Sequence, residues 1–314
     1  MFVHSQHPGA SRRTALALGA GTALTAALGL AGSASAHASA APVATPGERR
    51  AAARFRALEE RYGARLGVHA LDVRTGRTLA HRDRERFPMC SLFKTLAAAA
   101  VLRDHDHDGT FLARRVHYTA AYVERSGWSP RTERKENIAA GMTIAELCDA
   151  TIRFSDNTAA NLLLRELGGP ASVTRFARSV GDPVTRLDRW EPELNTAEPW
   201  RDTDTTSPRA IARTYGRLVL GRVLDPADRA LLTDWLLRNT TSSTRFRKGL
   251  PAEWTVADKT GGGDYGTNNN AGVAWRPDGG PVVLAVLTTR SDPQAPAVDE
   301  LVADAAAVVA EELR

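Results

Sequence analysis

Cysteine is scarce in this sequence, and the residue types that bind metals are not clustered. Only two cysteines, Cys90 and Cys148, occur among 314 residues. Neither belongs to a Cys-x-x-Cys motif or a Cys/His cluster, so nothing in the sequence predicts a metal site.

Blocks of like charge and long apolar runs are also missing from most of the chain. The formal net charge is +5, and Arg12 and Arg13 supply two of those charges in an N-terminal stretch without acidic residues. Elsewhere Lys and Arg are scattered among Asp and Glu, as on a solvated surface, so we expect no nucleic-acid partner. After residue 40, no segment approaches the roughly 18 uninterrupted apolar residues that a membrane-spanning helix needs. The body of the protein should therefore be soluble.

Residues 1–36 have the features of an export signal. The arginine pair at residues 12–13 resembles a twin-arginine signal, which carries a folded protein across the membrane. A charge-free, weakly apolar stretch follows and ends in an A-x-A cleavage site at Ala36, with Ala40 as the alternative site. We expect a secreted mature chain that does not stay inserted in a membrane. An uncleaved anchor is the competing interpretation.

Both ends of the mature chain combine a helix with strands. Residues 47–63 form a helical pattern that ends at Gly63, and residues 65–82 read as two strands around a Thr-Gly turn. Near the C-terminus, TVADKTG, NNAGVAW and PVVLAVLTTR are strand-like, and AVDELVADAAAVVAEELR closes the chain as a helix. Between residues 91 and 237 the signals are mostly helical.

This order predicts an α/β lobe built from both ends of the chain, with an all-helical lobe inserted into it. We place the α/β lobe at residues 47–85 plus 238–314 and the helical lobe at residues 86–237. A cleft is expected where the two lobes meet. The irregular stretch at about residues 183–206 should be a large surface loop.

The segment PMCSLFK, residues 88–94, contains the first chemical candidates. Proline and serine before an alanine-rich stretch indicate the start of a helix. Ser91 and Lys94 would then share one helix face, with Lys94 Nζ in reach of Ser91 Oγ and free N–H groups available to an oxyanion. The pair is a candidate nucleophile and proton acceptor. The alternative is a capped helix with an exposed lysine.

A second motif, Ser155-Asp156-Asn157, lies between two helical patterns. Asp and Asn at such a place commonly cap the second helix. In a catalytic site, the serine hydroxyl would instead pass a proton to a leaving nitrogen, and the asparagine amide would contact the substrate.

A third motif, Lys259-Thr260-Gly261 followed by Gly262, comes at the end of a strand. Lysine adds positive charge, threonine adds a hydroxyl donor, and the glycines let a backbone approach a ligand closely. The alternative is an ordinary step from a strand into a turn.

The order and spacing of these three motifs are typical of class A β-lactamases and penicillin-binding proteins. Over its whole mature length the chain resembles a class A serine β-lactamase of the actinobacterial type. The resemblance implies an α/β plus all-α fold of the β-lactamase/penicillin-binding transpeptidase-like class, with a five-stranded antiparallel sheet flanked by helices and an inserted helical lobe. It also implies a small-molecule β-lactam substrate, a monomer, and no metal or organic cofactor.

The stretch RWEPELN, residues 189–195, matches a loop motif that penicillin-binding proteins lack. By this resemblance, Glu191 is the base for the water that releases the acyl group, and Asn195 is the second residue that holds this water. The alternative for Glu191 is an exposed loop acid.

The same resemblance places RWEPELN in an omega-type loop, residues 186–204, whose neck is closed by a salt bridge. The partners would be Arg189 and Asp204. Asp202 lies close by, but the DTTSP stretch fits the family pattern better from Asp204.

Two further side chains match positions that contact the substrate in the family. Arg245 matches an arginine that holds the β-lactam carboxylate beside Thr260 and Ser155. Arg247 competes with it, because residues two apart share a face of an extended segment; a plain surface arginine is the alternative. Trp128 matches an aromatic residue at the cleft entrance, and a tryptophan packed on its own domain is the alternative.

Other contacts that the resemblance implies do not depend on a charged side chain. The backbone N–H groups of Ser91 and Gly262 would form the oxyanion hole. Asn157, Thr260 and Gly261 would line the substrate.

Both cysteines match positions that form disulfides in some family members. The usual partner position of Cys90 is Gly263 here, and that of Cys148 is Ala98. We therefore expect two free, buried thiols.

The implied mechanism begins with attack of Ser91 on the lactam carbonyl, while Lys94, or Glu191 through a water, takes the serine proton. Ser155, aided by Lys259, then protonates the leaving nitrogen. Glu191 finally activates the water that regenerates the enzyme, which would confer resistance to β-lactam antibiotics.

Two other functions fit the three Ser/Lys motifs. A penicillin-binding peptidase would release D-alanine from cell-wall peptides. A non-catalytic β-lactam sensor would be acylated without turnover.

Overall fold

The computed structural model describes residues 45–314, and the predicted leader, residues 1–36, lies outside them. Five long strands and several short ones alternate with helices in an order that matches the predicted helix-strand ends and helical middle. In chain order the elements are α1 (Pro46–Tyr62), β1 (Arg65–Asp72), β2 (Thr78–His81), β3 (Phe87–Pro88), a 3-10 turn (Cys90–Leu92), α2 (Phe93–Asp104), α3 (Thr110–Ala113), β4 (Arg115–Val116), α4 (Ala120–Ser126), α5 (Lys135–Ala140), β5 (Met142–Thr143), α6 (Ile144–Arg153), α7 (Asn157–Glu166), α8 (Ala171–Ser179), a 3-10 turn (Glu193–Thr196), β6 (Thr205–Thr206), α9 (Pro208–Val219), α10 (Pro226–Leu237), α11 (Phe246–Gly249), β7 (Thr255–Gly263), β8 (Thr267–Trp275), β9 (Pro281–Thr289) and α12 (Asp299–Glu312).

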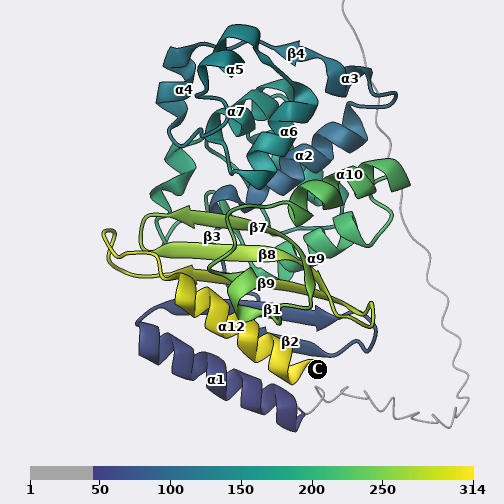
Figure 1. Ribbon diagram of the computed structural model, residues 1–314. Coiled ribbons are helices and arrows are strands. Elements are labelled where there is room, and N and C mark those ends of the chain that lie inside the picture. Colours follow the sequence, from purple (N-terminus) through teal and green to yellow (C-terminus); the bar gives the residue numbers. More distant parts are fainter. Residues whose placement is uncertain (1–44) are drawn as a thin grey trace, which may run out of the picture. The chain divides into compact units, whose positions relative to one another are not determined.

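The main sheet joins the two ends of the chain. It has five strands in the order β2-β1-β9-β8-β7, and all neighbouring pairs are antiparallel. Helices α1 and α12 lie side by side along one face of the sheet (Figure 1). The predicted five-stranded antiparallel sheet flanked by helices is therefore confirmed.

Strand alternation divides the buried apolar residues between two cores. In β9, Val282, Leu284 and Val286 belong to a core shared with α1 and α12. Their neighbours Val283, Ala285 and Leu287 belong to the larger core on the side of the helical segment. This period of two is the expected geometry of a strand that is buried on both faces.

Helix α2 is the buried axis of the helical segment. Every residue from Phe93 to Leu102 is buried, including Lys94. A helix that is apolar all round must be covered on every side, and α6, α7, α8 and α10 pack against it. The 3-10 turn that contains Ser91 leads directly into α2 and packs against β7 and β8 of the sheet.

The alanine-rich helix follows Pro88 and Ser91, as predicted, but only after a short strand and a turn. Phe87 and Pro88 form the short strand β3, which pairs with Thr206 and Thr205 of β6, and α2 begins only at Phe93 after the 3-10 turn. A proline lacks the N–H that a central strand would need, but it is tolerated in such a short two-stranded ribbon. The pairing with a segment far along the chain was not visible in the local pattern.

Both cysteines are free and buried, as predicted. Burial raises the pKa of both thiols, with the nearby Glu191 carboxylate adding to the effect at Cys90 and that of Asp149 at Cys148. An ideal Cβ on Gly263 would lie 3.0 Å from Cys90 Sγ, so position 263 faces Cys90 as the resemblance implies.

The described residues fall into one compact unit. The division into lobes at residues 86 and 237 stays a prediction. No helix among residues 45–314 has the length and apolar character that crossing a membrane requires.

Candidate active site

Ser91 is held in a short turn whose backbone is fixed from two sides. The Asn269 amide on β8 donates to the Pro88 carbonyl at 2.9 Å, and the buried Tyr215 hydroxyl on α9 donates to the Leu92 carbonyl at 2.9 Å. Cys90 has a left-handed backbone with φ of 47°, which costs about 1–3 kcal/mol for a non-glycine residue and persists only where its surroundings impose it. Ser91 itself is 7% exposed.

Strand β7 runs directly beside this turn. An ideal Cβ on Gly261 would lie 3.0 Å from the Met89 carbonyl and 3.2 Å from the Ser91 nitrogen. Gly261, which was expected to let a ligand approach, thus lets the backbone of the turn containing Ser91 lie close to β7. Gly262 has room instead, since its nearest contact would be the Thr267 carbonyl at 3.6 Å. Because β7 is the last strand of the sheet, its outer edge is available to pair with another backbone.

Lys94 is fully buried, so the alternative of an exposed lysine is wrong. Its Nζ donates to the Ser155 carbonyl at 2.8 Å and to Asn157 Oδ1 at 2.6 Å, and it lies 2.9 Å from Glu191 Oε1. The expected contact of Lys94 with Ser91 Oγ is not among the hydrogen bonds of residues 45–314. Ser91 Oγ instead donates to Glu191 Oε1 at 3.4 Å.

Ser155 brings both lysines of the predicted motifs together. Its Oγ accepts hydrogen bonds from Lys259 Nζ at 3.0 Å and from Lys94 Nζ at 3.4 Å. Burial lowers the pKa of Lys259 well below its ordinary value, and the positive charges of Lys94 and Arg245 lower it further. The site therefore concentrates positive charge beside a serine hydroxyl.

Asp156 and Asn157 have structural contacts. Asp156 is the N-cap of α7 and accepts from the Ala159 N–H, as the capping interpretation predicts. Asn157 accepts from Lys94 at Oδ1 and donates from Nδ2 to the Ser126 carbonyl. A direct contact of Asn157 with substrate stays a prediction.

Glu191 is 3% exposed, so the alternative of an exposed loop acid is wrong. Its Oε1 faces Lys94 and Ser91, while its Oε2 accepts from Asn195 Nδ2 at 2.5 Å. The buried Asn195 Oδ1 accepts no hydrogen bond from the described residues. This arrangement gives a carboxylate and an amide oxygen that are both able to accept a hydrogen bond from a water beside Ser91.

Asn161 is a functional residue that the sequence reasoning missed. Its Oδ1 accepts from the Glu191 N–H at 3.0 Å, and its Nδ2 donates to the Glu191 carbonyl at 2.9 Å. Asn161 comes four residues after Asn157 on α7, so both side chains lie on one helix face. That spacing was the available signal. Asn161 fixes the backbone of the residue whose side chain reaches Ser91.

The predicted neck of the loop is present. Arg189 Nε lies 2.6 Å from Asp204 Oδ2, and Asp204 Oδ1 accepts from the Asp188 and Arg189 N–H groups. The Asp202 carboxylate is 73% exposed and lies 3.7 Å from Arg86 Nε. The choice of Asp204 over Asp202 is confirmed.

Arg245 and Arg247 do not share a face of an extended segment. Arg245 caps the short helix α11, which begins at Phe246, and residues two apart on a helix point in different directions. Arg247 is bonded to Asp258 at 3.2 Å and to two backbone carbonyls. Arg245 pairs with Asp299 at 2.7 Å and donates to the Gly261 carbonyl at 3.2 Å, next to the Lys-Thr-Gly strand.

Two further predicted substrate contacts, Trp128 and Thr260, differ in exposure. Trp128 is 66% exposed, and its indole N–H donates to the Phe154 carbonyl, just before Ser155. Thr260 is buried, and its hydroxyl lies 2.5 Å from that of Thr241, a residue that no sequence motif indicated.

No cluster of three or more potential metal ligands occurs among residues 45–314. The groups that meet at Ser91 are a serine hydroxyl, the buried carboxylate of Glu191 and the buried side chains of Lys94 and Lys259.

Comparisons with known proteins agree with this arrangement. Residues 50–313 match the profile of a family described as the beta-lactamase enzyme family. A beta-lactamase of Streptomyces fradiae is 65% identical over 302 residues, which cover 96% of each chain. A beta-lactamase of Kitasatospora aureofaciens is 56% identical over 304 residues, covering 96% of this chain and 97% of that one.

Solved structures of similar proteins have the same fold. The structure of a beta-lactamase from Streptomyces albus G superposes with a TM-score of 0.83 at 63% identity, covering 83% of this chain and 98% of that one. A beta-lactamase from Desulfarculus baarsii superposes with a TM-score of 0.82 at 48% identity, covering 85% of this chain and 98% of that one.

The close approach of β7 to Ser91 predicts different effects at two adjacent glycines. Gly261→Ala should lower the free energy of unfolding by roughly 1–3 kcal/mol, because its Cβ meets backbone atoms that cannot move aside. Gly262→Ala should leave stability nearly unchanged, since its Cβ meets no atom closer than 3.6 Å. Urea unfolding of both variants measures this difference, and equal losses of stability would contradict the close approach.

The neck salt bridge predicts that Asp204→Asn loosens the loop and misplaces Glu191. We expect turnover at least about tenfold lower, because small displacements of a catalytic group are costly. We also expect faster cleavage of the loop in limited proteolysis. The exposed Asp202→Asn is the matched control and should behave as wild type. Unchanged turnover and protease resistance in Asp204→Asn would refute this role of the neck.

Proposed function

The chain belongs to the beta-lactamase enzyme family and hydrolyses β-lactams, and we propose that it does so through an acyl-enzyme on Ser91 that is released by water activated by Glu191. Hydrolysis of this kind protects a cell from β-lactam antibiotics. The observation that carries the proposal is the position of Glu191, whose two carboxylate oxygens contact Ser91 and Asn195 respectively.

In the acylation step, we assign the Ser91 proton to Glu191, directly or through a water. An ammonium group has three N–H donors and no acceptor. Lys94 Nζ has three close acceptors, at 2.6, 2.8 and 2.9 Å, and a longer shared contact with Ser155 Oγ at 3.4 Å, so an ammonium group here has no donor to spare and no lone pair for the Ser91 proton. Lys94 then acts as a fixed positive charge that orients Glu191. Without the carboxylate at position 191, Lys94 loses its ion-pair partner and is the remaining basic group that could take the Ser91 proton, at a lower rate.

Ser155 is proposed to protonate the leaving nitrogen. Because its Oγ accepts from Lys259 and Lys94, the hydroxyl proton is free to point away from both, toward a substrate. Loss of that proton would leave an alkoxide that two ammonium groups stabilise. Lys259 contributes charge in this step, and Thr260 contributes a hydroxyl donor for a substrate carboxylate.

Arg245 is proposed as the further contact to that carboxylate. It lies beside Gly261 of β7, whereas Arg247 is engaged by Asp258. The backbone N–H groups of Ser91 and Gly262 would hold the oxyanion, because donors already in position cost no reorganisation during the reaction. Asn157 would orient Lys94, and Trp128 would flank the entrance.

In the deacylation step, Glu191 takes a proton from water while that water attacks the ester carbon of the acyl-enzyme. Support comes from Asn195, whose Nδ2 donates to Glu191 Oε2 and whose buried Oδ1 has no partner among the described residues. A water bound by both Glu191 and Asn195 would lie beside Ser91, so its attack on the ester carbon would require little movement. A penicillin-binding peptidase or a sensor would have no use for this pair.

We propose export by the twin-arginine route and a monomeric mature enzyme. The first proposal is supported by the arginine pair at residues 12–13 and the A-x-A site at Ala36. N-terminal sequencing of the protein from culture medium tests export, with a start at His37 expected. Analytical sedimentation tests the monomeric state.

The proposed function predicts sustained turnover by the purified enzyme. It should hydrolyse many equivalents of a chromogenic cephalosporin and release no D-alanine from a D-Ala-D-Ala peptide. A single equivalent of product per chain would identify a sensor instead, and D-alanine release would identify a peptidase.

The lowered pKa of Lys259 predicts a fall of kcat/KM at alkaline pH. As pH rises through the lowered pKa, Lys259 loses the positive charge that supports Ser155 in protonating the leaving nitrogen, so kcat/KM should fall at a pH below the ordinary lysine value of about 10.4. Lys259→Arg keeps its charge at all these pH values, so its fall should move to higher pH. The same alkaline limb in both proteins would rule out Lys259 as its source.

A further inference from the structure

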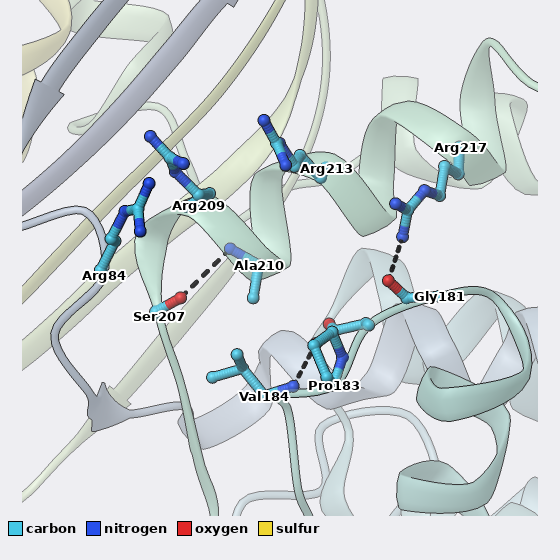
Figure 2. Close-up of a pocket in the computed structure, with 10 residues that line it drawn as sticks. Arg84, Gly181, Pro183, Val184, Ser207, Arg209, Ala210, Arg213 and Arg217 are labelled. Atoms are coloured by element: carbon cyan, nitrogen blue, oxygen red, sulfur yellow. Dashed lines mark hydrogen bonds between the residues drawn. The ribbon is translucent and has the colours of Figure 1, made fainter. Parts of the chain in front are cut away.

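A pocket lies beside helix α9, and neither Ser91 nor any other proposed catalytic residue lines it. Its volume is about 300 Å³, at the lower end of the range for small-molecule sites. The walls come from the turn after β2, the connection that follows α8, and α9 from its N-cap Ser207 to Arg217 in its last turn (Figure 2).

Four arginines line this pocket. Arg209, Arg213 and Arg217 follow one another at intervals of four residues on α9, so they form one stripe along the helix. Arg84 adds a fourth guanidinium from a segment more than a hundred residues earlier. Figure 2 shows Arg84, Arg209 and Arg213 extending to the same side of the helix, while Arg217 turns toward Gly181.

Two of these arginines have partners within the protein. Arg209 pairs with Asp83 at 2.8 Å, and the same carboxylate also contacts His69. Arg217 donates to the carbonyls of Val180 and Gly181 at 2.8 Å, which neutralises none of its charge.

Arg84 and Arg213 differ from most arginines of this molecule. Neither has an ion pair, a side-chain hydrogen bond or an aromatic contact within residues 45–314. Like charges that face one pocket repel each other, and an anion between them would remove that repulsion. The two free guanidinium groups therefore offer donors that the protein itself does not use.

The one acidic residue in the pocket wall does not fill this need. Asp182 is buried, and its carboxylate accepts from the N–H groups of Val184 and Thr185 and from the hydroxyls of Thr185 and Thr214. Its oxygens are thus engaged by its own loop and by Thr214 of α9. Four guanidinium groups against Asp182 in the wall and Asp83, which pairs with Arg209, leave the pocket with a net positive charge.

We propose that this pocket binds a small oxyanion of the phosphate type that carries at least two negative charges. The planar guanidinium group binds phosphate oxygens in pairs, which a scattered set of lysines would not do. Arg84 and Arg213 are the principal contacts, and Arg209 and Arg217, already fixed by their partners, form the rest of the cationic wall.

Calorimetric titration with pyrophosphate at fixed ionic strength tests the proposal. The wild-type chain should bind one pyrophosphate in a saturable manner. The double variant Arg84→Gln/Arg213→Gln should bind at least about tenfold more weakly, because it loses charge-assisted hydrogen bonds. The control Arg56→Gln removes an equally exposed arginine from α1, outside the pocket, and should bind as wild type. β-Lactam hydrolysis should be the same in all three proteins, which separates this test from that of the catalytic site.

A flotation assay with vesicles of phosphatidic acid distinguishes a lipid headgroup from a free phosphate. Co-flotation that the double variant loses would place the phosphate on a lipid; pyrophosphate binding without co-flotation would place it in solution. The proposal is overturned if the wild-type chain binds neither probe, or if Arg56→Gln loses as much affinity as the double variant.

Discussion

Lys94 Nζ and Glu191 Oε1 lie 2.9 Å apart, and neither side chain has any exposed surface. Removing two charges from water costs several kcal/mol per ion, so such a pair is tolerated only when its remaining donors and acceptors are also satisfied. Here Ser155, Asn157, Asn195 and Ser91 supply those partners. The pair thereby joins α2, the turn before α7 and the omega-type loop. Ser91 and Ser155, the two hydroxyl groups of the proposed mechanism, both contact this pair.

The loop that carries Glu191 has little regular structure and depends on side chains for its shape. Asn161 holds the Glu191 backbone from α7, and Arg189 with Asp204 closes the neck. On the other side of Ser91, glycine at position 261 allows β7 to approach the turn. A rigid helix, a sheet edge and a tethered loop therefore meet at one hydroxyl group. Both proposed steps require the loop, because Glu191 is proposed to take the Ser91 proton in acylation and the water proton in deacylation.

Much of this arrangement could be predicted from the sequence. The helix and strands at each end followed from local periodicity, whereas the five-stranded sheet, the free thiols and the choice of Asp204 over Asp202 were implied by the family resemblance that the ordered motifs carry. The predictions that were wrong or missing concerned contacts between segments that are distant in the sequence. Lys94 turns to Glu191 instead of Ser91 because the loop delivers a carboxylate to it. Arg84 meets the arginines of α9 only in the folded chain, so the scattered arginines of the sequence gave no indication of a cationic pocket.

Intact-mass spectrometry of the Glu191→Gln variant with benzylpenicillin tests the central claim most directly. The variant should form the Ser91 adduct more slowly than wild type, with Lys94 as the remaining base, and then retain it, while the wild-type adduct is transient. Ser91→Ala should form no adduct. An adduct that forms and clears on Glu191→Gln as fast as on wild type, or no adduct on that variant at all, would contradict the roles given to Glu191 and Lys94.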